Sequence, residues 1–336
     1  MNEINTRYSE LAELDVYKLF LGATWERMDS DERLAALQEL EIRMARRMGR
    51  TPRPVLRMKS EPADGYVCMG CFTPGRKTIS INELFLTPNP IYGDGFSAAK
   101  AIDTIIHEGR HAYQHEMTED ESRLDDPEIM KWRANQIAYI RGEGIIGIPR
   151  SAQQAMYAFQ PIERDARQFA AQEFRRIYRT LYREMGYEDD SLKLGLDEML
   201  RDKQHEFDNL MKVKPSQMNR FDMYAGTALA VMGRRDKKLQ ARLIQHGMNS
   251  KMDPHVFDDV REILDHPEWA QRFCDGLDDM GLDDFSDMDD MKVKVEDAFF
   301  QDTPSLEALM QEMLDSRPVS GGLTEQSPWK EKRRGL

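Results

Sequence analysis

Apolar residues recur at helical spacing along the first fifty residues. Over residues 6–28 they form one stripe, which predicts an amphipathic helix: Leu11, Leu14, Tyr17, Leu21 and Trp25. A second helix is predicted from Asp29, because Glu32 follows three residues later in the arrangement of a capping box. Gly49 and Pro52 are typical of a helix end. The chain therefore opens with two predicted helices.

The pattern changes to short strand-like runs between residues 53 and 86. Three strands are predicted, over residues 55–58, 66–72 and 77–86. A turn sequence at residues 73–76 joins the last two, so these are predicted to form a hairpin. Polar and apolar residues alternate within the third run, as they do in a half-buried strand.

Most of the remaining chain has helical periodicity. Helices are predicted over residues 97–117, with Ser97 as N-cap, and over residues 161–185, opened by a proline. Another helix begins near Asp126, and a glycine-rich loop covers residues 142–149. The order of elements predicts an α+β protein with a small mixed or antiparallel sheet and a largely helical C-terminal part.

Length and composition indicate a soluble protein with a real core. The 336 residues suffice for two ordinary domains, or for one domain with a large helical extension. Hydrophobic residues make up 40% of the chain and charged residues 32%. The formal net charge of −13 argues against a general nucleic-acid binder, because a phosphate backbone would repel it.

The sequence also indicates where in the cell the protein is expected. No segment approaches the ~20 apolar residues that span a bilayer, and the first residues do not resemble a signal peptide. Cys68, Cys71 and Cys274 cannot form a disulfide framework, so we expect a cytoplasmic protein or one exported without a cleaved signal. Cys68 and Cys71 are interpreted as strand residues rather than as a metal or redox pair.

The most specific chemistry lies in the helix predicted over residues 97–117. Residues 107–111 read His-Glu-Gly-Arg-His, so two histidines lie one helical turn apart and can reach a single ion. Glu108 points toward the same side and can act on a metal-bound water. This is the HExxH arrangement of zinc metalloproteases, and it predicts a Zn²⁺ site. The alternative is a surface helix that carries two histidines by chance.

A catalytic zinc site needs a third protein ligand. His115 lies about 12 Å along the helix from His107, too far to share the ion, and is predicted to be an exposed residue. Glu163 is the better candidate, because it falls in the first turn of a helix that can pack across the active-site helix. Small residues in that helix would allow a close approach: Ala166 and Ala170. Asp165 is the weaker alternative, and Glu163 could instead be an ordinary acid at a helix start.

Three segments together resemble zincin metallopeptidases of the gluzincin type. They are Ile-Ser-Ile-Asn at residues 79–82, residues 104–114 with the HExxH motif, and Gln-Pro-Ile-Glu-Arg-Asp-Ala at residues 160–166. The chain is most similar to compact bacterial enzymes of polymorphic toxins and mobile elements, and distantly to repressor-cleaving peptidases of the ImmA/IrrE type. Arg167 departs from the pattern, because many gluzincins carry an acid four residues after the glutamate ligand.

The resemblance implies a zinc-dependent metallopeptidase with a protein or peptide substrate, acting as a toxin, an effector or a regulatory protease of a mobile element. Glu108 would be the catalytic base, and three residues would hold Zn²⁺: His107, His111 and Glu163. Two alternatives stay open, a non-catalytic binding or scaffold protein and a zinc hydrolase of a non-peptide amide. Glu108 disfavours the scaffold, because a structural zinc site does not need it.

Other residues are candidates for supporting roles. Tyr139 and Tyr157 are candidates for stabilising the oxyanion, although either could be a core aromatic. Asp103 could orient an imidazole, or be an exposed acid at the helix start. The strand at residues 78–82 is expected at the sheet edge, where the amide of Ser80 could pair with a peptide.

These expectations divide the chain into four regions. They are an N-terminal helical segment (1–52), a zincin-like metallopeptidase domain (53–190), an acidic helical region (191–317) and a disordered tail (318–336). The acidic region lacks the ligand spacing of a calcium-binding loop. It is a candidate surface for a protein partner.

Overall fold

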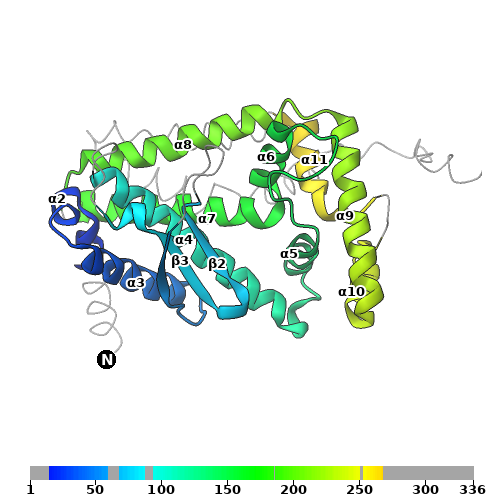
Figure 1. Cartoon of the computed structure of the whole chain (residues 1–336), viewed down its shortest axis with the longest axis horizontal. Helices are drawn as coiled ribbons and strands as arrows, with labels where there is room; N and C mark the ends of the chain where they lie inside the picture. The colour runs from blue at the N-terminus through cyan, green and yellow to red at the C-terminus, as the bar shows by residue number, and fades with distance from the viewer. Residues whose placement is uncertain (1–14, 60–67, 88–93, 185, 250–252, 268–336) are drawn as a thin grey trace, which may run out of the picture. The chain divides into compact units, whose positions relative to one another are not determined.

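The computed structural model describes residues 15–59, 68–87, 94–184, 186–249 and 253–267. The chain divides into two compact units, residues 1–288 and 289–336, and all described residues belong to the first. They form helices and one three-stranded sheet, which confirms the α+β class (Figure 1). Three sets of predicted features lie outside the described residues: the first part of the helix at 6–28, residues 250–252 and 268–317 of the acidic region with Cys274, and the tail.

The sheet is mixed, with the strand order β1-β3-β2: β1 (Val55–Met58), β2 (Gly70–Thr73) and β3 (Thr78–Asn82). The strands β2 and β3 form the predicted hairpin, while β1 pairs with β3 in parallel. Lys77 adopts the left-handed conformation in the turn, with a φ of 52°. The expectation that β3 is an edge strand is wrong, because β3 has a partner strand on both sides. Ser80 therefore cannot receive a peptide by strand addition.

The start of the chain departs from the continuous helix predicted over residues 6–28. A 3₁₀ turn at Lys18–Phe20 and a short helix α2 (Gly22–Trp25) are separated by Leu21, whose ψ of 135° is extended. The reason is a contact with a distant residue, because Asp189 accepts a hydrogen bond from the Gly22 amide at 2.6 Å. Two residues of the predicted apolar stripe, Tyr17 and Trp25, are still buried.

The next helix, α3 (Ser30–Arg47), confirms a local prediction. Asp29 accepts hydrogen bonds from the amides of Asp31 and Glu32, and the Glu32 side chain accepts one from the Asp29 amide. This reciprocal pair is the predicted capping box. Gly49 follows the helix with a φ of 67°, a conformation that glycine adopts without strain.

The other α-helices of the described residues are α4 (Asp94–Glu119), α5 (Pro127–Ile137), α6 (Arg150–Phe159), α7 (Pro161–Arg179), α8 (Asp190–Leu210), α9 (Pro215–Arg235), α10 (Lys237–Gln245) and α11 (Asp258–Asp265). The helix α4 begins three residues before the N-cap predicted at Ser97. The helix α6 was not predicted as a separate element. It ends before Gln160, whose ψ of 149° is extended. Gln160 precedes a proline, and such a residue avoids the helical region.

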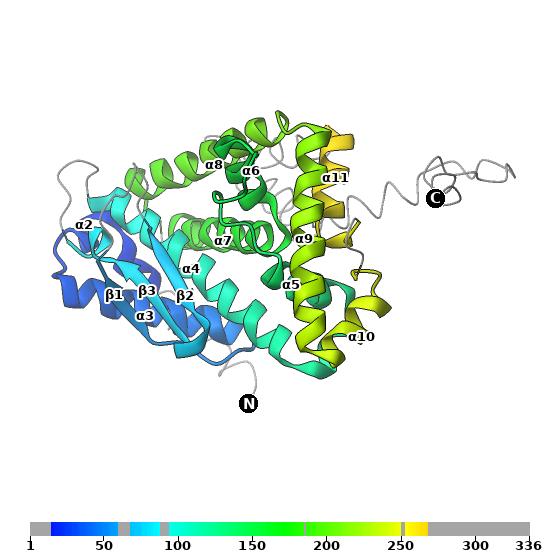
Figure 2. The ribbon, with the colours of Figure 1, turned by 45° about the vertical axis from the view of Figure 1, so that its right-hand side comes forward.

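The helix α4 lies at the centre of this unit. The helices α3 and α4 cover one face of the sheet, and α7 and α8 pack against α4 away from the sheet (Figure 2). Ile79 and Ile81 of β3 are fully buried in the resulting core together with Ile105 and Ile106 of α4. Since α8 contacts both α4 and α6, the helices after residue 190 pack with those before it. The region boundaries at 52/53 and 190/191 stay predictions.

Within the described part of the chain, no helix combines the length and the apolar composition that a membrane span requires.

The strand β2 crosses α4 closely at Gly70. A Cβ atom at this position would lie 2.5 Å from Thr104 Cγ2 and 3.1 Å from the carbonyl oxygen of Ser80. Side-chain contacts under 3 Å force a shift of the neighbouring atoms. The absence of a side chain at Gly70 therefore sets the distance between β2 and α4.

We predict that Gly70→Ala lowers the free energy of unfolding by about 1–3 kcal/mol, as overpacking of a core does. Urea denaturation measures the loss. Gly75→Ala in the hairpin turn is the control, because a Cβ there has no atom within 4 Å. Adding Thr104→Ser to Gly70→Ala removes the crowded methyl group and should restore most of the stability. Equal losses for the Gly70 and Gly75 variants would contradict the close contact.

Candidate metal centre

Two histidines of α4 face the first turn of α7. His107 and His111 lie one turn apart, with their ring centroids 4.5 Å apart and their planes perpendicular. Their Nε2 atoms are 2.9 Å apart, and each side chain is 16% exposed. The spacing of the motif on a regular helix is sufficient to bring these two nitrogen atoms together.

Glu163 reaches the same point from α7. Its Oε2 lies 3.3 Å from His107 Nε2 and its Oε1 lies 3.3 Å from His111 Nε2, while only 2% of its side chain is exposed. One ligand atom from each of the three residues falls within a group no wider than 4.8 Å. The structure thus brings together the three residues that the sequence suggested as ligands.

Buried polar side chains hold the start of α7 in place. Asn135 of α5 accepts a hydrogen bond from the Ile162 amide at 3.0 Å and donates one to Gln160 at 3.0 Å. Gln160 in turn binds the amide and the carbonyl of Ile140, at 2.9 and 2.8 Å. These bonds satisfy otherwise unpaired groups at the helix start, and thereby set the position of Glu163.

A second set of contacts orients His111. Its Nδ1 lies 2.8 Å from Gln114 Oε1, and Gln114 Nε2 donates to the Ile162 carbonyl and to Asp165 at 2.9 and 2.6 Å. Asp165 also binds the guanidinium of Arg110 through two bonds of 2.8 and 2.9 Å. A bond at Nδ1 selects the tautomer that leaves Nε2 free for a metal. Asp165 is thus occupied, which argues against it as the third ligand.

Gln114 fulfils the role that the sequence suggested for Asp103. The carboxylate of Asp103 acts on Lys203 of α8 instead, and it partly offsets the effect of burial, which lowers the Lys203 pKa to about 8. Gln114 lies three residues after His111 on the same helix, and that spacing was the available signal.

Glu163 and His111 stabilise each other's charges when no metal is present. Burial would raise the pKa of Glu163, but His111 and His107 hold it well below its usual value. Burial would lower the pKa of His111, but the carboxylate of Glu163 outweighs it and raises this pKa to about 9. Such a site carries a proton that a metal ion must displace.

Glu108 lies on the sheet side of the centre. It is 8% exposed, and its Oε2 accepts a hydrogen bond of 2.7 Å from the Phe72 amide of β2. His115 packs edge-on against the Phe72 ring, with centroids 5.7 Å apart. The expected exposure of His115 is therefore wrong, since only 22% of its side chain is exposed. His115 does not belong to the ligand group, in agreement with its distance along the helix.

The two candidate tyrosines lie beside Glu163. Tyr139 donates a hydrogen bond to Glu163 Oε1 at 2.5 Å, and burial together with that carboxylate raises the pKa of Tyr139. The Tyr157 ring meets the Tyr139 ring edge-on, with centroids 6.1 Å apart. Arg167 lies over the Tyr157 ring at 5.7 Å and forms an ion pair with Glu206 of α8. The residue that departs from the gluzincin pattern is thus held by the C-terminal helices.

The donor set fits a zinc ion. A tetrahedral ion with bonds of about 2.0–2.1 Å holds its ligand atoms about 3.3 Å apart. The two imidazole nitrogens lie 2.9 Å apart, and each lies 3.3 Å from a different oxygen of the Glu163 carboxylate. Glu163 Oε2 is buried and accepts no hydrogen bond from any described residue. A buried acceptor without a donor is rare in a folded protein, and a cation between the three residues would satisfy it. Three ligands leave one position for water or substrate.

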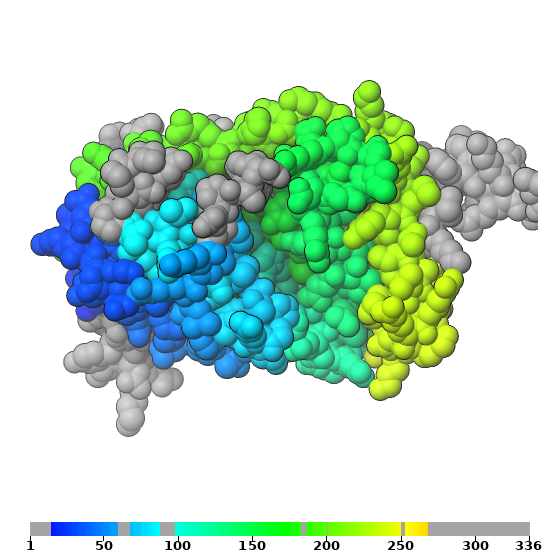
Figure 3. All heavy atoms as spheres, in the orientation of Figure 1, coloured from blue at the N-terminus to red at the C-terminus, as the bar shows by residue number. Residues whose placement is uncertain are grey.

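The two histidines are partly open to solvent. Their side chains are each 16% exposed, whereas Glu163 is enclosed. The molecular surface is hollowed between the light-blue strands and the green helices (Figure 3).

A second group of candidate ligands lies in the C-terminal part: Asp253, His255 and Asp258. Its members are exposed or half-buried, and Asp258 already binds Arg261 at 2.6 Å. Exposed acidic groups of this kind are common without a metal, so this group is not assigned one.

No model of a known protein family matches the chain, and searches of curated proteins and of solved structures find no similar protein. The function is therefore inferred from the chemistry of the site itself.

We predict that His111 of the metal-free protein stays protonated up to about pH 9. Because this pKa is raised on folding, the proton stabilises the folded state below about pH 6.5, and the contribution is lost between about pH 6.5 and 9. Glu163→Gln removes the negative charge that opposes the effect of burial, so the His111 pKa should fall. An NMR titration of the imidazole measures both values, and the same pKa in both proteins would contradict the coupling.

Proposed function

We propose that the protein is a zinc-dependent metallopeptidase of the zincin type. Zn²⁺ would be held by His107, His111 and Glu163, and Glu108 would be the general base. The observation that carries the proposal is that ligand atoms of these three residues converge next to the glutamate of an HExxH motif, and that Glu163 Oε2 is buried without a donor.

The protein's own residues would divide the work of hydrolysis. When bound, Zn²⁺ would supply the Lewis acidity that polarises a carbonyl group and makes water more acidic. Glu108 would take the proton of the attacking water and pass it to the leaving amine. Gln114 would keep the His111 ring in the tautomer that exposes Nε2.

The position of β2 supports an extended peptide as the substrate. Among the described strands, β2 pairs with β3 alone, and the Phe72 amide points to Glu108 rather than to β3. A peptide added along this edge would pass directly beside the proposed base. The edge strand used for recognition would thus be β2, in place of the β3 strand expected from the sequence. A role in a toxin or a mobile element, a cytoplasmic location and a partner of the acidic region stay predictions.

We predict that the protein binds one zinc ion and that Glu163→Ala loses it, because two ligands remain. Elemental analysis of protein prepared in metal-free buffer measures the stoichiometry. Glu119→Ala is the control, since this acid lies on the same helix α4 but its side chain is 50% exposed and outside the ligand group. Absence of zinc from the wild-type protein, or full occupancy in Glu163→Ala, would contradict the ligand set.

We predict that Glu108→Gln keeps zinc and slows hydrolysis by about 10²–10⁴-fold, because the amide cannot accept the proton of water. The substrate is a peptide library prepared from a whole proteome, so that a narrow specificity is still detected by mass spectrometry. Cleavage by the wild-type protein alone supports the proposal. If zinc-loaded wild-type protein cleaves nothing, the chain is a binding protein or acts on a non-peptide amide.

A further inference from the structure

Tyr139 forms a hydrogen bond with one of the two carboxylate oxygen atoms of Glu163. It lies just beyond the end of α5, and its hydroxyl donates to Glu163 Oε1 at 2.5 Å. Glu163 Oε2, on the other side of the carboxylate, has no donor and lies 3.3 Å from His107 Nε2. A hydrogen bond to one oxygen of a carboxylate restricts its rotation, so the phenol determines where the other oxygen points.

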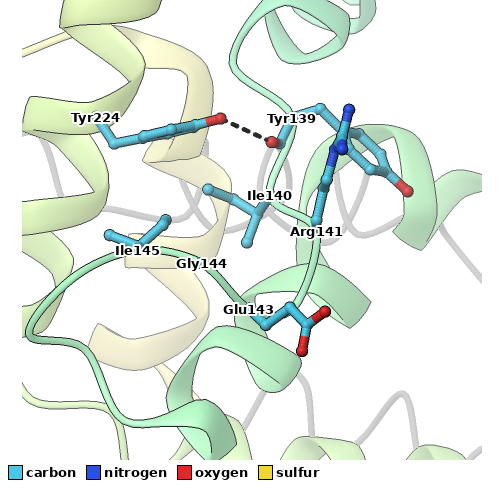
Figure 4. Close-up of a pocket in the computed structure, with 7 residues that line it drawn as sticks. All are labelled: Tyr139, Ile140, Arg141, Glu143, Gly144, Ile145 and Tyr224. Atoms are coloured by element: carbon cyan, nitrogen blue, oxygen red, sulfur yellow. Dashed lines mark hydrogen bonds between the residues drawn. The ribbon is translucent and has the colours of Figure 1, made fainter. Parts of the chain in front are cut away.

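The backbone at Tyr139 is held from two directions. Tyr224 of α9 donates its hydroxyl to the Tyr139 carbonyl at 3.1 Å, and Gln160 binds the amide and carbonyl of Ile140. Figure 4 shows that the Tyr139 ring projects away from Tyr224, so that its carbonyl and its phenol point in different directions. The helix α9 thus reaches the metal centre through a single intervening residue.

This segment between α5 and α6 depends on such contacts for its position. It has no regular structure, and three of its glycines adopt positive φ values of 79°, 92° and 78°: Gly142, Gly144 and Gly147. Arg220, one turn before Tyr224 on α9, donates to the Gly147 carbonyl at 2.7 Å. A cavity of about 220 Å³ lies between the segment and Tyr224 (Figure 4). The segment therefore has space to shift if its hydrogen bonds to α9 are removed.

Tyr157 is a close neighbour of Tyr139. It belongs to α6, its ring lies against the Tyr139 ring, and the Arg167 guanidinium covers its face. Burial and the Glu163 carboxylate raise the pKa of Tyr157, so this phenol also belongs to the surroundings of Glu163. A matched control therefore comes from outside this group: Tyr113 of α4, whose ring packs against Trp132 and Arg110.

We propose that Tyr139 is a positioning residue for the third metal ligand and that Tyr224 holds it, so that helix α9 is part of the metal centre. This inference rests on the proposed zinc site. It assigns a role to the C-terminal helices, which the HExxH motif does not involve.

The test is the zinc affinity of the full chain, measured by competition with a chromophoric chelator. Tyr139→Phe should weaken zinc binding by about 10–100-fold, the usual effect of losing a residue that supports a ligand. Tyr113→Phe, the matched control, should leave the affinity within about twofold, because the Tyr113 ring packs against Trp132 and Arg110. Co²⁺ in place of zinc adds a second measurement, because its visible spectrum should change in Tyr139→Phe and not in Tyr113→Phe.

Tyr224→Phe removes the hydrogen bond from α9 to the Tyr139 carbonyl without changing Tyr139 itself. It keeps the inference testable if Tyr139→Phe does not fold. It should weaken zinc binding by less than Tyr139→Phe does. Since Tyr224 acts through the Tyr139 hydroxyl, the double variant should bind zinc as Tyr139→Phe does, whereas independent effects would multiply. Wild-type affinity in Tyr139→Phe, or multiplying losses in the double variant, would overturn the inference while leaving the zinc site intact. Absence of zinc from the wild-type protein would overturn both.

Discussion

The close packing of α7 against α4 is the constraint on which the candidate centre depends. The histidines belong to α4 and the glutamate to α7, so a small separation of the two helices would remove the common point that they share. Ala166 and Ala170 of α7 are fully buried and allow the close approach. Gln114 then joins the helices through a bond to the Ile162 carbonyl. Apolar contact sets the distance, and a directional bond sets the register.

Buried amide side chains around this contact have hydrogen-bond partners. Gln114, Asn135 and Gln160 are all fully buried, and their side chains bind backbone groups or one another. Satisfied networks of this kind make a core rigid and specific. Glu163 Oε2 lies beside this network, and it is buried without a hydrogen-bond donor. Because the carboxylate faces both imidazoles, its surroundings are suited to hold a cation.

The helices after residue 190 contact the surroundings of Glu163 at three points. Tyr224 of α9 binds the backbone of Tyr139, and Glu206 of α8 pairs with Arg167. Asp259 of α11, which is fully buried, pairs with Arg164 at 2.5 Å. Arg164 and Arg167 lie about one helical turn or less from Glu163 along α7, and Tyr139 binds Glu163 directly. The C-terminal part thus contributes to the geometry of the centre, although it carries none of the proposed ligands.

The sequence by itself determined the features that neighbouring residues control. The capping box at Asp29, the proline start of α7 and the shared face of His107 and His111 each depend on a few adjacent positions, and local backbone geometry decides them. Tertiary structure decided the central position of β3 and the interruption of the first helix at Leu21. It also decided the contacts of Glu108 with Phe72 and of Glu163 with Tyr139. These features join residues that lie far apart in the chain, and their geometry follows from the packing of whole elements rather than from any local pattern.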